Sequence, residues 1–191
     1  MQILLASKSP RRKQLLEQLG YTITIVHQDI EESFPADLPV HEVPMFLAEQ
    51  KARGVINALE NKDQVILASD TIVTMNNEIF HKPVDFADGV RILSTLQGKT
   101  HEVVTGVCLL SQDKCITFKD IAEVTFMPMT EAEIKFYLET YKPYDKAGAY
   151  AIQEWIGLAK IKKMNGSYAT VMGLPTHVVY EKLQAHFSEK V

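Results

Sequence analysis

The sequence of 191 residues has no hydrophobic run of about 18 residues, the length that a membrane-spanning helix needs. Its start has too short an apolar stretch for a signal peptide. Its only cysteines, Cys108 and Cys115, lie in apolar, β-like surroundings, so we expect two buried, reduced thiols and no disulfide framework. These absences predict a cytoplasmic protein without a membrane contact.

Basic residues are in slight deficit, because 20 Lys and Arg stand against 24 Asp and Glu for a formal net charge of −4. This balance excludes a broad basic face that coats DNA or RNA, so we expect no nucleic-acid partner. Arginine is scarce as well, and two of the few arginines, Arg11 and Arg12, are adjacent. A local anion site near the N-terminus remains compatible with an acidic protein.

Signatures of several large enzyme classes are also absent. The sequence contains no GxxxxGK[ST], GxGxxG, HExxH or GxSxG, the signatures of P-loop, dinucleotide-fold, zinc-protease and serine-hydrolase enzymes. The six histidines are scattered without metal-ligand spacing, so we expect structural or surface roles for them. Chemistry must be sought among other residues.

Strand-like and helix-like segments alternate along the chain, which predicts one α/β domain over 1–191 with a mixed β-sheet flanked by helices. Strands are expected at 2–6, 21–27, 65–68, 72–74, 78–80, 101–110 and 115–127. Helices are expected at 10–19, 44–59, 86–97, 130–141 and 175–187. Loops are expected at 28–39 and 142–157, and a hairpin is expected around Asn165-Gly166, between 158–164 and 167–171.

A first candidate site is Ser7-Lys8-Ser9-Pro10-Arg11-Arg12, which links a strand to a helix start. Backbone N–H groups at a helix N-terminus attract anions, and the Ser7 and Ser9 hydroxyls add donors. Arginine matches phosphate oxygens bidentately. Because adjacent helix residues face different ways, at most one of Arg11 and Arg12 is expected to point straight into the site. An ordinary N-cap with solvated cations is the alternative.

A second candidate is Asp70, which we expect directly after the apolar strand 65–68. Ligands of α/β proteins collect outside the carboxyl ends of strands, so a carboxylate there can bind Mg²⁺ or accept a proton from water. A turn residue that caps its own backbone is the alternative. Further candidates, for which a solvated surface charge is the alternative, are Glu31, Glu32, Lys51 and Lys82.

A third candidate is the segment 145–153, which is rich in Gly and Ala and ends at Gln153. Small residues let the backbone approach a flat ligand, and the Gln153 amide complements the N3–H and carbonyl edge of uracil or thymine. A tightly packed structural turn is the alternative. The three candidates together supply an anion cradle, carboxylates, lysines and an amide, which suits a nucleoside triphosphate with Mg²⁺.

The sequence resembles the Maf family of nucleoside triphosphate pyrophosphatases in segments that span nearly the whole chain. These are ASKSPRRKQLL (6–16), DIEE (29–32), LAEQKA (47–52), ASDTIV (68–73), HKP (81–83), LQGKTHEVVTGV (96–107), DKAGAYAIQ (145–153) and NGSYATVMGLP (165–175). The resemblance implies hydrolysis of a nucleoside triphosphate between the α- and β-phosphates. It also implies an elongated mixed sheet, two lobes around a nucleotide-binding cleft, and a homodimer.

The resemblance also assigns roles to residues. It makes Asp70 the proton acceptor that activates water, and makes Glu32 and Asp70 ligands of a divalent cation, Mg²⁺ or Mn²⁺. The residues that it places on the phosphates, with Ser7 alongside them, are Ser9, Arg11, Arg12, Lys51 and Lys82. The sequence resembles the dTTP/UTP branch of the family in three places: SPRR, the threonine after Asp70, and the glutamine at 153. This resemblance makes Arg12, Thr71 and Gln153 specificity positions.

Two points remain open at this level. The family usually has Gly after its IQ pair, whereas Glu154-Trp155 follows here, and an extra carboxylate beside a base pocket would alter base preference. Maf proteins are also associated with inhibition of septum formation. The alternative function is therefore a nucleotide-binding regulator of cell division that acts without turnover.

Overall fold

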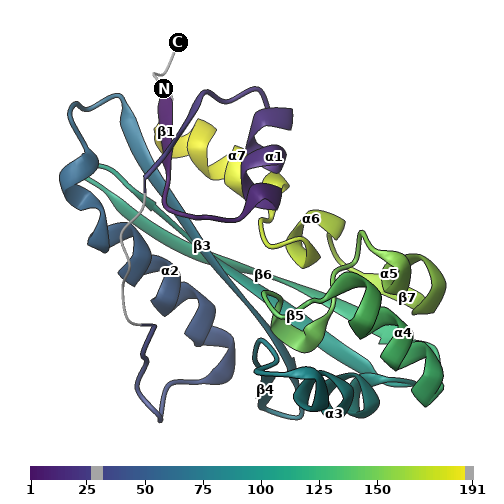
Figure 1. Cartoon of the computed structure of the whole chain (residues 1–191). Coiled ribbons are helices and arrows are strands. Elements are labelled where there is room, and N and C mark those ends of the chain that lie inside the picture. The colour runs from purple at the N-terminus through teal and green to yellow at the C-terminus, as the bar shows by residue number, and fades with distance from the viewer. Residues whose placement is uncertain (27–31, 188–191) are drawn as a thin grey trace. The chain divides into compact units, whose positions relative to one another are not determined.

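The protein is described by a computed structural model that covers residues 1–26 and 32–187 (Figure 1). Its strands are β1 (Gln2–Leu5), β2 (Ile23–Ile25), β3 (Gln64–Met75), β4 (Glu78–Phe80), β5 (Thr100–Leu110), β6 (Cys115–Phe126) and β7 (Ile161–Asn165). Among the described residues they form one sheet in the order β2-β1-β3-β5-β6-β7, with β4 on β3. β1 pairs with β2 and β3 in parallel, whereas β3–β4 and β6–β7 are antiparallel.

The helices are α1 (Pro10–Gln18), α2 (Val43–Gly54), α3 (Phe86–Leu96), α4 (Glu131–Tyr141), α5 (Trp155–Lys160), α6 (Tyr168–Val171) and α7 (Thr176–His186). Short 3-10 turns are η1 (Val40–Glu42), η2 (Ile56–Ala58) and η3 (Ala147–Ala149). The expected α/β class, with a mixed sheet flanked by helices, is confirmed. No helix within 1–26 or 32–187 is both long and apolar enough to cross a bilayer.

Two compact units divide the described residues. The first lies within 1–70, 105–120 and 173–191, and the second comprises 71–104 and 121–172. The boundary in the middle of β3 falls between Asp70 and Thr71. The expectation of one domain over the whole chain stays a prediction.

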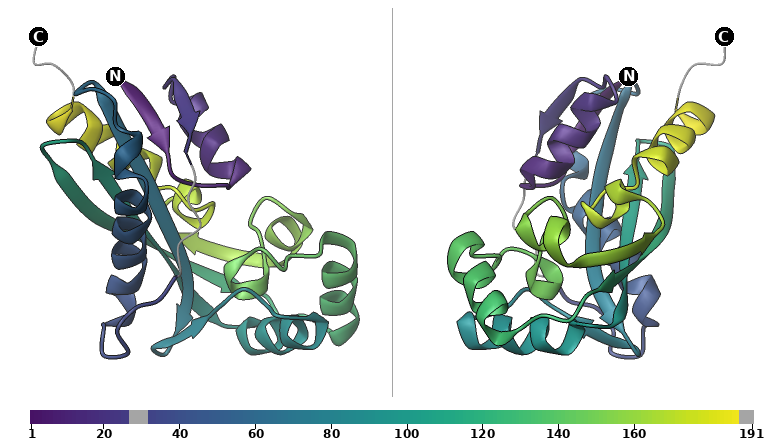
Figure 2. Two further views of the ribbon diagram at one scale, coloured as in Figure 1. Left: turned by 60° about the vertical axis from the view of Figure 1, so that its left-hand side comes forward. Right: turned by 90° about the vertical axis from the view of Figure 1, so that its right-hand side faces the viewer.

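The core of the first unit has two sides because alternate residues of a strand face opposite ways. On one side Ile3 and Leu5 of β1 pack with Leu16 of α1, and with Val179 and Leu183 of α7. On the other side Leu4 and Ala6 pack with Ala48 and Ala52 of α2. Figure 2 shows the same helices from two further directions. Buried on both faces, β1 is a continuous apolar run, as expected for a parallel strand.

The second unit has its own core between β3, β5 and β6 and the helices α3 and α4. Both helices begin as expected. The Asp85 side chain accepts a hydrogen bond from the Asp88 N–H, and Thr130 with Glu133 forms a complete capping box. The β3–β4 hairpin also forms as expected around Asn76-Asn77, both of which have positive φ.

The expected hairpin around Asn165-Gly166 is wrong. Residues 155–160 form α5, and 161–165 form β7, which pairs with Glu123–Phe126 of β6 instead of with 167–171. Gly166 has φ +124°, and a Cβ there would lie 2.8 Å from Ala122 Cα, so the glycine lets two chain segments approach closely. The N–H of Val171 bonds to Ser167 O, which closes a helical turn.

The two thiols differ in exposure. Cys108 is buried in the core beside α2, but Cys115, the first residue of β6, is exposed. The expectation of two buried thiols is therefore wrong for Cys115, because it directly follows the exposed turn at 112–114. Both are free, with their sulfur atoms 3.8 Å apart.

His101 is buried in the second unit between the rings of Phe126 and Tyr150. Its Nε2 lies 2.8 Å from the Tyr150 hydroxyl, and its Nδ1 has no hydrogen-bond partner within the described part of the chain. Burial therefore lowers the pKa of His101 from 6.5 to about 4.

Because the folded pKa of His101 is the lower one, the unfolded chain binds the extra proton first, and stability falls as the pH drops below 6.5. We expect this histidine alone to remove about 2 kcal/mol of unfolding free energy between pH 7.5 and 5. Urea denaturation of the wild type and His101→Gln at both pH values checks this, since glutamine keeps a polar partner for Tyr150 without titrating. Equal pH dependence in the two proteins contradicts the expectation.

Candidate active site

The candidate site begins where β1 ends. Pairing of β1 with β3 stops at Leu5↔Leu67, after which the Ala6 N–H bonds to Leu67 O and the chain turns toward α1. β3 instead continues to Met75, so Asp70 lies inside a strand, and the expectation that it follows one is wrong. The segments 65–68 and 72–74 belong to one continuous strand that includes Ser69 and Asp70. The site lies at the carboxyl end of β1, not of β3.

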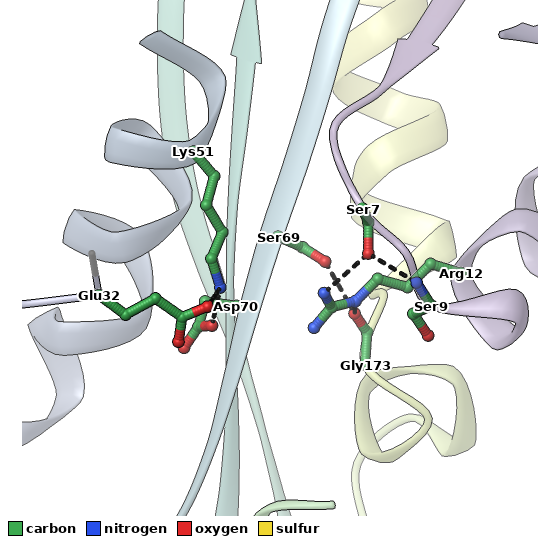
Figure 3. A network of polar contacts seen from close by, with 8 residues as sticks. All are labelled: Ser7, Ser9, Arg12, Glu32, Lys51, Ser69, Asp70 and Gly173. Atoms are coloured by element: carbon green, nitrogen blue, oxygen red, sulfur yellow. Dashed lines mark hydrogen bonds and ion pairs between the residues drawn. The ribbon is translucent and has the colours of Figure 1, made fainter. Parts of the chain in front are cut away.

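A carboxylate–lysine cluster lies on the α2 side of β3 (Figure 3). The Lys51 ammonium is 2.6 Å from Asp70 Oδ1 and 2.8 Å from Glu32 Oε1. The side chains of Lys51 and Asp70 are 17% and 12% exposed, whereas that of Glu32 is 45% exposed. One mostly buried cation thus joins an inner and an outer carboxylate.

The donors of this cluster suit a divalent cation that is shared with a phosphate ligand. Glu32 and Asp70 offer carboxylate oxygens, the ligands that hard cations prefer, and Mg²⁺ is commonly held by one or two carboxylates plus substrate phosphates. No group of three or more His, Cys, Asp or Glu residues that could hold a metal exists within 1–26 and 32–187. Glu32 and Asp70 would therefore hold such a cation only together with phosphate oxygens.

An arginine–serine cluster lies on the opposite side of β3, at the start of α1 (Figure 3). Arg12 Nε donates to Gly173 O at 2.9 Å, and Arg12 Nη1 donates to Ser7 Oγ at 3.3 Å. Ser7 Oγ also accepts from the Ser9 N–H at 3.2 Å. Ser9 is the N-cap residue, as expected, but its hydroxyl makes no capping bond to the helix. These contacts hold the guanidinium at the helix N-terminus.

Sequence reasoning gave no role to Ser69 or Gly173. Ser69 is fully buried and donates from Oγ to Gly173 O at 3.0 Å, so one carbonyl binds both Ser69 and Arg12. Gly173 has φ +102°, a conformation that strains other residues. The position of Ser69, a polar residue within an apolar strand, was a signal that could have indicated its role. The Gly173 carbonyl gave none, because its partners are distant in sequence.

Charges of both signs act on Arg12. Burial lowers the pKa of its guanidinium, the Asp70 carboxylate opposes that shift, and the neighbouring Arg11 adds to it. Asp70 and Glu32 are thus close enough to stabilise the Arg12 cation across β3. Arg11 makes no side-chain hydrogen bond or ion pair with the described residues. The expectation that at most one of Arg11 and Arg12 points straight into the site stays a prediction.

The first unit therefore brings together most of the residues expected on the phosphates and the cation. These are Ser7, Ser9, Arg12, Glu32, Lys51 and Asp70. Arg11 also lies in the first unit, and the second unit contains the remaining three expected residues, Thr71, Lys82 and Gln153. Lys82 and Gln153 are exposed there. Their substrate contacts stay predictions, as does that of Arg11, and Glu31 lies outside the described residues.

Comparison with known proteins covers nearly the whole chain. Residues 2–186 match the family model of Maf-like proteins. The chain is 42% identical over 189 residues to a dTTP/UTP pyrophosphatase of Cytophaga hutchinsonii, covering 99% of this chain and 86% of that protein. It is 43% identical over 183 residues to a dTTP/UTP pyrophosphatase of Christiangramia forsetii, covering 96% and 93%. The chain therefore belongs to the Maf-like protein family.

Proposed function

We propose that this protein hydrolyses dTTP and UTP to the monophosphate and pyrophosphate. The observation that supports this most directly is the Lys51 bridge between Asp70 and Glu32, with a partly buried arginine on the other side of the same strand. Carboxylates, a lysine and an arginine at one strand suit a polyphosphate with a cation. Relatives named dTTP/UTP pyrophosphatase, 42% and 43% identical, support the same substrate.

The proposed step is attack of water on the α-phosphorus. A bond forms between the water oxygen and this phosphorus, the bond from phosphorus to the α–β bridging oxygen breaks, and pyrophosphate leaves. Asp70 accepts the proton of the attacking water and later returns it to solvent. Arg12 and Lys51 offset the charge of the phosphates as it shifts toward the leaving group.

A divalent cation is part of the proposal. Glu32 and Asp70 would hold Mg²⁺ or Mn²⁺ together with the phosphates, where the ion supplies charge neutralisation and activation of water. The homodimer and the cytoplasmic location that the family resemblance implies belong to this proposal as well.

A panel of nucleoside triphosphates with Mg²⁺ or Mn²⁺ tests the activity. We expect pyrophosphate release that is fastest with dTTP or UTP, slower by about tenfold or more with dCTP, and abolished by a chelator. The panel records the released phosphate species as well as the rate. Orthophosphate as the first product contradicts cleavage between the α- and β-phosphates. Binding without turnover favours the regulator that acts without catalysis.

A further inference from the structure

The turn that presents Gln153 is tied at both ends to one oxygen atom. The N–H of Glu154 bonds to Ala151 O at 3.1 Å, which closes the turn around Gln153. The hydroxyl of Tyr137, on α4, accepts from the Ala151 N–H at 3.1 Å and donates to the Glu154 carboxylate. The two ends of the turn cannot move apart without breaking a bond to the same hydroxyl.

That hydroxyl is itself firmly placed. Tyr137 is fully buried, and its ring stacks on Tyr141 at 5.1 Å between centroids and on Trp155 at 6.5 Å. Trp155 in turn contacts the edge of Phe136 at 5.2 Å. Because packed aromatic rings have few alternative orientations, the oxygen offers a fixed reference point for the turn.

The negative charge of the Glu154 carboxylate is balanced by a lysine of the same unit. The second carboxylate oxygen of Glu154 lies 3.6 Å from the Lys146 ammonium, and both side chains are mostly buried. Lys146 also pairs with Asp145 at 2.7 Å. The Glu154 carboxylate is thus directed at Tyr137 and Lys146.

The chain that leads into the turn is held in an uncommon backbone conformation. Gly148 has φ +69°, and a Cβ there would come within 2.7 Å of the Val73 side chain. Ala149 has φ +60°, a conformation that is strained for a residue other than glycine and persists only where surrounding contacts require it. Those contacts include the Gly148 N–H bond to His81 O and the approach of Tyr150 to His101. The segment is therefore fixed on both sides of Gln153.

We propose that Tyr137 and Glu154 are positioning residues that fix the Gln153 amide and so set the preference between pyrimidine bases. The inference rests on the proposed function and extends it. Uracil and thymine present an N3–H donor beside a carbonyl, whereas cytosine presents an acceptor beside an amino group. A turn held in one conformation fixes the direction from which the exposed Gln153 side chain approaches the base and so favours the first pattern, whereas a loosened turn lets the amide approach either one.

The test compares Tyr137→Phe and Glu154→Ala with the wild type, measuring kcat/KM for dTTP and dCTP. We expect each substitution to lower the dTTP:dCTP ratio about tenfold, with kcat for dTTP changed by less than about twofold. The double variant is expected to lower the ratio no further than Tyr137→Phe does, because Tyr137→Phe already removes the hydroxyl that binds both Ala151 and Glu154. In a Gln153→Ala background, Glu154→Ala is expected to leave the ratio unchanged.

The control is Tyr141→Phe, which removes a hydroxyl from the same helix one turn away and is expected to leave the ratio unchanged. Glu154→Ala alone decides the outcome if Tyr137→Phe lowers the melting temperature below the assay temperature. A wild-type ratio in Glu154→Ala, or independent effects in the double variant, overturns the inference.

A second measurement separates this inference from the proposed function. Trp155, the single tryptophan, adjoins Glu154 and reports the turn by its fluorescence. Titration with dTMP and dCMP gives base preference without turnover, and we expect Glu154→Ala to reduce a preference for dTMP about tenfold. If the wild type prefers dTMP but releases no pyrophosphate, and Glu154→Ala reduces that preference, the proposed function fails and the positioning role stands. If it has no preference in either assay, the positioning role fails.

Discussion

Asp70→Asn is expected to lower pyrophosphate release by about 10³-fold, while the affinity for dTTP changes by less than about threefold. Asparagine keeps the shape of the side chain and a carbonyl oxygen for Lys51, which now lies 2.6 Å from Asp70. It cannot accept a proton from water, and it is a weaker ligand for a cation. Single-turnover rates with dTTP, beside equilibrium binding of dTTP, measure the two effects separately.

The matched control for this change is Asp63→Asn, which alters an exposed aspartate just before the same strand. We expect wild-type rates from it. A near wild-type rate in Asp70→Asn refutes the role as proton acceptor. Loss of binding in proportion to the loss of rate shows instead that Asp70 acts only by holding the substrate complex together.

Arg12→Lys is expected to lower kcat/KM for dTTP by about 10²-fold, mainly through a higher KM. The guanidinium uses two different N–H groups to bind Gly173 O and Ser7 Oγ, and its plane is fixed by that pair. A lysine ammonium cannot reproduce both bonds and present a planar fork to a phosphate. Since burial already lowers the pKa of Arg12, a lysine at this place also keeps its charge less readily.

Steady-state kinetics with dTTP checks the arginine prediction, with Arg91→Lys as the control. Arg91 is an exposed arginine that also binds through two nitrogens, here to Asp88, so the control makes the same chemical change away from the candidate site. We expect wild-type constants from the control. A wild-type KM in Arg12→Lys contradicts a phosphate-binding role for the guanidinium.

Local sequence signals predicted the elements that depend on neighbouring residues. The caps at Asp85 and Thr130 and the turn at Asn76-Asn77 need only residues within one helical turn or one hairpin, and all three form as expected. Asn165-Gly166 is a comparable signal, but the partner of 161–165 is a strand some 40 residues earlier. A short-range pattern does not contain that pairing, so the hairpin expectation failed.

The candidate site shows the same division between local and distant information. Sequence patterns supplied Lys51, Glu32 and Asp70 as separate candidates, and the family resemblance assigned their roles. Their arrangement around one ammonium follows from packing of α2 on β3. The Ser69–Gly173 contact joins residues 104 positions apart through a backbone carbonyl. Any residue type has such a carbonyl, so the sequence alone gave no reason to pair the two.

Side chains alternate in direction along β3, and this alternation limits where the sequence can tolerate an insertion or a deletion. Ser69 and Asp70 project to opposite sides of the strand, and the phase is set by the pairing of 2–5 with 64–67. Losing or gaining one codon between 64 and 70 would exchange the two side chains, turning the carboxylate toward Gly173 and the hydroxyl toward Lys51. Insertions in the exposed loop at 60–63 leave that phase intact. Among active homologues, insertions and deletions should therefore occur in the loop at 60–63 and not in residues 64–70 of β3.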